Sequence, residues 1–178
     1  MTWPYDTRKP ILRRRFIGVP SVHGHLGGSD SIGVNYARLS QVEIPWRMEI
    51  DRIAIQNGNA VLGNVRVGIY KEGSIIDDPE GGSLLWQSGS YIQSVVESFQ
   101  WVDIVPPIIL EAGRYYCVVV VDNATATSRN YNNDATVVAD RLGWGWVHAF
   151  GAFPSPCPAV TDQASASIFL LRVSRNLA

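Results

Sequence analysis

Three carboxylates, Asp77, Asp78 and Glu80, lie close together in the stretch GIYKEGSIIDDPEGGSLLWQSGS, beside a proline and a pair of glycines. Side chains of this type can bind a divalent cation or transfer a proton. Catalytic carboxylates for hydrolysis need a fixed separation across a substrate, whereas proline and glycine favour a tight turn. We therefore interpret the segment as a hairpin connection. A weak calcium site and a catalytic role are the alternatives.

Histidine and cysteine provide the other candidate reactive groups. His23 and His25 have a spacing that would place both rings on one side of a strand, as a metal pair requires, but the only other histidine is His148. Cys117 lies in the apolar run YYCVVVV and is expected to be a buried, unreactive thiol. Either a disulfide between Cys117 and Cys157 or two separately buried thiols fits the sequence. We predict no metal site, no cofactor and no enzymatic activity.

A basic segment begins the chain. Residues 1–15 contain five basic residues and one acidic residue, a net charge of +4, although the whole chain has a net charge of −1. Because the rest of the chain is net acidic, we expect this segment to dock on an acidic neighbouring protein subunit. Nucleic-acid binding and a solvated tail are the alternatives. The expected docking residues are Arg8, Lys9, Arg13, Arg14, Arg15 and Phe16.

Two further segments carry side chains suited to recognition. The sequence GWGWV places two indoles on the same side of a strand, where they could stack on a sugar ring, and TATSRNYNND offers polar side chains on an expected loop. The alternatives are burial in the core, favoured for at least one tryptophan, and an ordinary solvated loop. The candidate glycan-binding or partner-binding residues are Arg129, Asn130, Tyr131, Asn132, Trp144 and Trp146.

The pattern along the chain predicts the elements that position these residues. The chain has 178 residues, of which 46% are hydrophobic and 17% charged, which fits one domain with a substantial core. Short apolar or alternating runs are separated by Gly, Pro, Asn and Asp clusters, and no segment has a helical period. The expected strands are 31–45, 48–56, 64–71, 83–89, 99–105, 114–122, 143–150 and 167–174.

These strands predict an all-β fold, a two-sheet antiparallel β-sandwich of the jelly-roll-like kind over residues 31–175, preceded by an extended arm over residues 1–30. The run of Val118 to Val121 should alternate between two covered faces of a central strand. We see no signal peptide and no apolar stretch long enough to cross a membrane, so we expect neither export through its own signal nor membrane insertion.

Residues 44–123 carry a set of motifs that resembles a known module. These are DRI at 51–53, RVGIY at 66–70, GSLL at 82–85 and LEAGRYY at 110–116. The set resembles a β-sandwich module of tailed-bacteriophage virion proteins, found in tail fibres, head fibres and other surface components. The long Asn-rich insert at 123–135 departs from this pattern.

The resemblance implies a structural role rather than an active site. We expect a non-enzymatic protein on the particle surface, either a head decoration or fibre or a tail component, that is assembled in the host cytoplasm and anchored by its N-terminal arm. Its expected partners are other virion proteins and further copies of itself. The alternative function is a carbohydrate-binding module that recognises a host-surface glycan.

Overall fold

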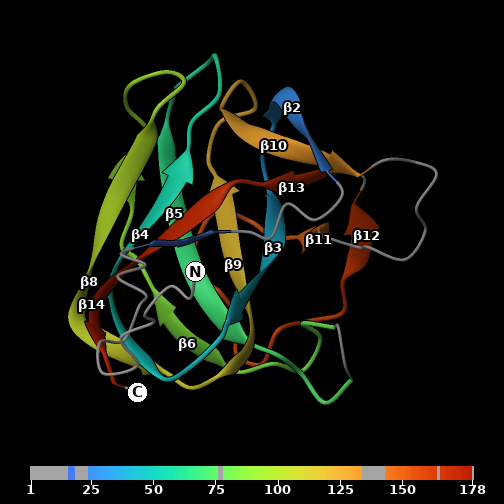
Figure 1. Ribbon diagram of the computed structural model, residues 1–178. Coiled ribbons are helices and arrows are strands. Elements are labelled where there is room, and N and C mark those ends of the chain that lie inside the picture. Colours follow the sequence, from blue (N-terminus) through green and yellow to red (C-terminus); the bar gives the residue numbers. More distant parts are fainter. Residues whose placement is uncertain (1–15, 19–23, 76–77, 134–142, 164, 178) are drawn as a thin grey trace, which may run out of the picture.

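The computed structural model describes residues 16–18, 24–75, 78–133, 143–163 and 165–177, with no side-chain description for 16–18, 24–27, 131–133 and 165. Within these residues every helix or strand assigned is a β-strand, and the paired strands are antiparallel (Figure 1). The all-β, sandwich-like fold expected from the sequence is therefore confirmed. No helix in the described ranges is long and apolar enough to cross a membrane.

The largest sheet has seven strands and forms one layer of the sandwich. Its order is β12-β11-β3-β9-β5-β6, with β7 also paired to β5. Its strands are β3 (Tyr36–Ile44), β5 (Asn64–Lys71), β6 (Leu84–Gln87), β7 (Tyr91–Ile92), β9 (Gly113–Val121), β11 (Gly143–Val147) and β12 (Thr161–Gln163).

A four-stranded sheet covers one face of this layer, on the left of Figure 1. Its order is β1-β14-β4-β8, so β1 and β8 are its two edges. Its strands are β1 (Phe16–Gly18), β4 (Met48–Gln56), β8 (Phe99–Leu110) and β14 (Phe169–Asn176).

The third sheet has three strands in the order β13-β10-β2 and lies at the upper right of Figure 1. It consists of β2 (Gly24–Ser31), β10 (Thr127–Asn133) and β13 (Ser165–Ser167). The prediction of a loop at 123–135 is thus wrong for residues 127–133, which form the middle strand of this sheet. The boundary expected at residue 30 falls inside β2. The described part of the expected arm is therefore paired into sheets.

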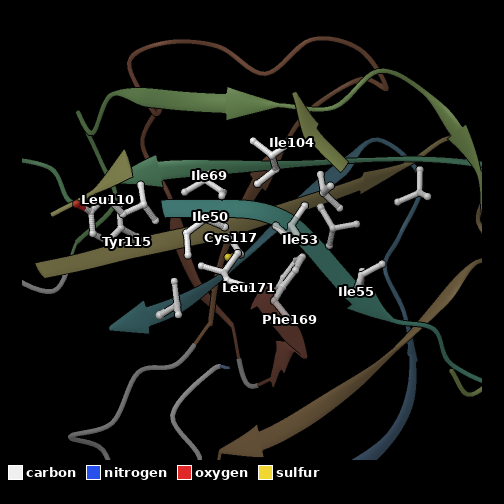
Figure 2. Close-up of a cluster of buried hydrophobic side chains, with 14 of the residues drawn as sticks. Ile50, Ile53, Ile55, Ile69, Ile104, Leu110, Tyr115, Cys117, Phe169 and Leu171 are labelled. Carbon is white, nitrogen blue, oxygen red and sulfur yellow. The ribbon is translucent and has the colours of Figure 1, made fainter. Parts of the chain in front are cut away.

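The main core lies between the seven-stranded and four-stranded sheets (Figure 2). Cys117, Val119 and Val121 of β9 face this core, together with Ile50 and Ile53 of β4. A β-bulge in the pairing of β4 with β8 explains how Ile50 and Ile53, three residues apart, both point inward. Without the extra residue, strict alternation would turn Ile53 toward solvent.

A second apolar cluster lies on the opposite face of the seven-stranded sheet. Val118 and Val120 of β9 pack there with Tyr70 and Tyr116, and the segment 150–160 covers them with Phe153 and Cys157. The predicted alternation of the valines between two covered faces is confirmed. Residues 150–160, which follow β11, thus cover this face of the large sheet.

Candidate functional site

The candidate recognition residues on β10 are largely committed to contacts within the protein. Asn130 is fully buried and its Nδ2 donates a hydrogen bond to the Asp30 carboxylate. Arg129 forms an ion pair with Glu97, with 2.6 Å between Nη2 and Oε1. Tyr131 and Asn132 pair through their backbones with β2 and β13, and their side chains lie outside the described set. The prediction that Asn130 lies on an exposed recognition loop is therefore wrong, because Asn130 is a buried residue of β10.

The two tryptophans are both buried, which settles the alternative in favour of the core. Trp144 is 3% exposed and Trp146 is 7% exposed. Trp144 packs edge-on against Tyr116 at 5.1 Å between ring centroids, and Trp146 against Tyr70 at 6.2 Å. The indoles do share one side of β11, as their spacing predicts, but that side is covered. They cannot form an exposed platform for a sugar.

The acidic segment connects the antiparallel neighbours β5 and β6, as the turn interpretation requires. The Asp78 carboxylate accepts a hydrogen bond from the backbone N–H of Glu80 at 2.8 Å, and the N–H of Gly82 donates to the carbonyl of Pro79 at 2.9 Å. Gly81 has a φ of 76°, a conformation that favours glycine. Asp77 lies outside the described residues.

The cysteines are free and buried on opposite faces of the large sheet, so the disulfide alternative is wrong. Burial raises the pKa of the Cys157 thiol to about 12, with Asp78 and Glu80 adding to the shift, and burial alone raises that of Cys117. Both thiols are therefore protonated at neutral pH and poorly suited to nucleophilic attack.

His148 stacks on Phe153 at 5.5 Å between ring centroids, and burial lowers its pKa. The other two histidines cannot be placed in the same way: His23 and the side chain of His25 lie outside the description. No group of three or more His, Cys, Asp or Glu side chains is arranged to hold a metal within the described part of the chain.

The start of the chain meets the sandwich at a sheet edge. Phe16, Ile17 and Gly18 pair with Arg172, Leu171 and Leu170 of β14. The basic docking residues Arg8, Lys9, Arg13, Arg14 and Arg15 lie outside the described residues, directly before this edge strand. Phe16 is thus placed by its backbone beside β14, and the predicted role of its side chain stays a prediction.

A site that the sequence pattern does not reveal lies at one end of the sandwich. Two loops meet there, residues 57–63 between β4 and β5 and residues 92–99 leading into β8, at the top of Figure 1. Their large apolar side chains are exposed, with Ile92 at 72% and Val95 at 66%. We call this surface the apolar tip; it consists of Leu62, Ile92, Val95, Val96 and Phe99.

Buried amide side chains hold the two loops together beneath the apolar tip. Asn57 Nδ2 donates to the carbonyls of Ser94 and Val95 and to Gln100 Oε1, the last at 3.0 Å. Gln93 Nε2 donates to Asn57 Oδ1 at 3.0 Å, while its Oε1 accepts from the N–H of Leu62 at 3.2 Å. A buried network of this kind fixes a loop conformation, because each broken bond leaves a polar atom unpaired.

The backbone of the second loop is strained where it is most exposed. Val95 has a φ of 53° and Glu97 a φ of 54°. A β-branched residue at positive φ is rare, and such strain of about 1–3 kcal/mol persists only where the surroundings impose it. Here the Val95 carbonyl accepts hydrogen bonds from Asn57 and Ser98, and the Glu97 N–H donates to Gly58. These bonds hold the backbone of the loop that carries Val95 and Val96 in its positive-φ conformation.

The arrangement is suited to binding another apolar surface. The loops 57–63 and 92–99 contain one ionisable side chain, Glu97, and it is paired with Arg129. An exposed apolar surface gains free energy when another apolar surface covers it. The sequence gives little sign of this exposed surface. Val95 and Val96 lie between Ser94 and Glu97 in a segment where apolar and polar residues do not alternate.

No protein-family model matches the chain, and no curated protein matches it.

Proposed function

We propose that this chain is a non-enzymatic structural protein of a tailed-phage particle, displayed on its surface and anchored by its N-terminal arm. Its partners are other virion proteins and further copies of itself, and it is assembled in the host cytoplasm. The virion context comes from the resemblance of residues 44–123. The observation that supports a binding role is the apolar tip, whose exposed side chains lie on two loops that buried amide side chains hold together.

The motif residues themselves have structural contacts, which is consistent with a scaffold. Asp51 accepts a hydrogen bond from Arg172 Nε at 2.8 Å. The Tyr70 hydroxyl donates to the Pro154 carbonyl at 2.5 Å, and the Arg66 guanidinium lies 5.7 Å from the centre of the Phe150 ring. These contacts join neighbouring strands or attach the segment after β11 to the large sheet. None of these contacts supplies a catalytic arrangement.

The carbohydrate-binding alternative loses its main support. It depended on exposed indoles and an exposed polar loop, but Trp144, Trp146 and Asn130 are buried.

Particles of the virus whose genome encodes the chain provide the test. Quantitative mass spectrometry of purified particles should find the chain at a constant ratio to the major capsid protein in independent preparations. A non-structural viral protein measured in the same samples is the control for carry-over. Recovery of the chain only in the soluble fraction of infected cells would contradict the proposal.

A further inference from the structure

We propose that Asn57 and Gly58 form a deamidation site that the folded protein blocks, and that the reaction, once it occurs, permanently releases the loop 92–99. The site is a chemical property of this chain and does not depend on the proposed function. Three observations support it: the sequence of the pair, the packing around Gly58 and the hydrogen bonds of Asn57.

The chemistry follows from the sequence. Asn57 is the only asparagine in the chain that a glycine follows. In such a pair the backbone nitrogen of the glycine, which has no side chain beside it, loses its proton and attacks Cγ of the asparagine. The new C–N bond closes a succinimide ring, and Nδ2 leaves as ammonia. Water then opens the ring at either carbonyl, which gives aspartate or isoaspartate. The reaction consumes water, releases ammonia and changes no oxidation state.

Packing explains why this reactive pair stands at the end of β4. A Cβ on Gly58 would lie 2.8 Å from Cβ of Thr127 and 2.9 Å from Cβ of Ser29, and closer still to the hydroxyl of Thr127. These separations are shorter than van der Waals contact, so a larger residue would push β10 and β2 away. The fold therefore requires the glycine, although the glycine makes Asn57 labile.

Hydrogen bonds hold both reacting groups in the folded protein. The Gly58 N–H donates to the carbonyl of Thr127 at 3.0 Å, so the nitrogen that would attack is already bonded. Asn57 is fully buried, and its Nδ2 and Oδ1 are held by the amide network beneath the apolar tip. The reaction therefore needs a local opening of this network, and its rate should follow the population of the open form.

Deamidation reverses the role of the Asn57 side chain. Its Nδ2 faces three oxygen acceptors, namely the carbonyls of Ser94 and Val95 and Oε1 of Gln100. A carboxylate oxygen in the same place has no hydrogen to donate and brings a negative charge against these oxygens. Isoaspartate would in addition lengthen the backbone directly after β4. Neither product can rebuild the network, so the loop 92–99 is released irreversibly.

Incubation of the purified full-length chain in mildly alkaline buffer tests the block. Deamidation at Asn57 is followed by peptide mapping, which separates the asparagine, aspartate and isoaspartate peptides. The chain unfolded in urea gives the rate of the pair without the fold. We expect the folded wild type to react at least about tenfold more slowly than the unfolded chain, because the open form is a minor state. Equal rates would overturn the proposal.

Gln93→Ala tests whether the amide network is the block. It removes the donor to Asn57 Oδ1 and leaves the reacting pair in place. We expect the folded variant to deamidate at Asn57 about tenfold faster than wild type, because a lost buried hydrogen bond favours opening by about this factor, whereas the rates in urea should match. The matched control is Met48→Ala, which weakens the core at the other end of β4 and should leave the rate close to that of wild type. No acceleration in Gln93→Ala, or equal acceleration in both variants, would show that the network does not control the reaction.

Asn57→Asp tests the release of the loop. We expect its melting temperature at neutral pH to lie below that of Asn57→Ala, because alanine only removes the donor whereas the carboxylate adds a charge facing the same oxygens. The difference should shrink in acid, where the carboxyl group takes up a proton and can donate a hydrogen bond. Equal melting temperatures at both pH values would overturn the release.

Wild-type protein deamidated during the incubation gives the same comparison without a substitution. The Ser94 N–H donates to Gln100 Oε1 at 2.8 Å, so its hydrogen exchange reports on the loop. We expect this amide to exchange faster in the deamidated protein than in fresh protein. Unchanged exchange would show that the loop keeps its conformation after the reaction, which would contradict the proposed release.

Discussion

Asn57 links the described core to the apolar tip. Its side chain is fully buried at the end of β4, and it bonds to two carbonyls of the exposed loop and to two further amide side chains. A buried amide that satisfies both its donor and its acceptor can specify a loop that apolar packing alone would leave free. At this scale the function of the tip depends on polar residues that are not themselves exposed.

Replacing Asn57 by alanine should therefore destabilise the protein. The substitution removes Asn57 Oδ1, the buried acceptor of Gln93 Nε2, so we expect a loss of about 1–3 kcal/mol in the free energy of unfolding, measured by urea denaturation. Asn59→Ala, at an exposed position in the same loop, is the control and should change stability by less than about 0.5 kcal/mol. Equal effects of the two substitutions would contradict the role of the buried network.

Sequence reasoning reached only part of the site at this scale. The spacing of Trp144 and Trp146 correctly placed both indoles on one side of a strand, but spacing does not say which side is covered. Here segment 150–160 covers it, a tertiary contact with no local signature. The exposure of Val95 depends in the same way on Asn57, which is distant in sequence.

Among the elements, β4 shows how a bulge joins core packing to surface charge. The register shifts between Ile50 and Arg52, which allows Asp51 and Arg52 to face outward together. Asp51 then pairs with Arg172 on β14, and Arg52 with Asp103 on β8. The two ion pairs connect the bulged strand to both its neighbours on the outer face of the four-stranded sheet.

This arrangement predicts a specific pH dependence. The hydrogen bond from Arg172 lowers the pKa of Asp51 below its usual value of 3.8. A carboxylate with a lowered folded-state pKa stabilises the protein above its unfolded-state pKa, and that contribution is lost as pH falls through the folded value. Asp51→Asn should therefore reduce the melting temperature at pH 7, and the difference from wild type should shrink below about pH 4. A difference that is constant from pH 7 to pH 3 would exclude the ion pair as its cause.

The strand β10 shows why one element was missed. Its sequence, TSRNYNN, has the composition of a loop, and β-propensity depends strongly on context. In the fold this strand lies between β2 and β13, where Ser128 Oγ and Ser167 Oγ lie 3.0 Å apart in a buried hydrogen bond. By contrast, the alternating valines of β9 were correctly assigned, because the two buried faces of a central strand leave an uninterrupted apolar run.

For the whole molecule, composition and turn spacing predicted the sandwich architecture. They did not predict that residues 16–18 and 24–31, within or next to the expected arm, pair into sheets. Short strands such as β1, with three residues, carry almost no sequence signal and form because β14 offers an edge to pair with. The arm proposed as the anchor is thus narrowed to residues 1–15, which precede this edge strand. Its basic residues would guide encounter with an acidic neighbour.

The most direct test of this account is the incorporation of a chain lacking residues 1–15 into particles, compared with the full-length chain. Because the deletion leaves β1 and every later strand in place, we predict melting curves that match within error and a truncated protein that is absent from purified particles. Equal incorporation of the two chains would contradict the central claim, since it would place the anchor on the sandwich itself.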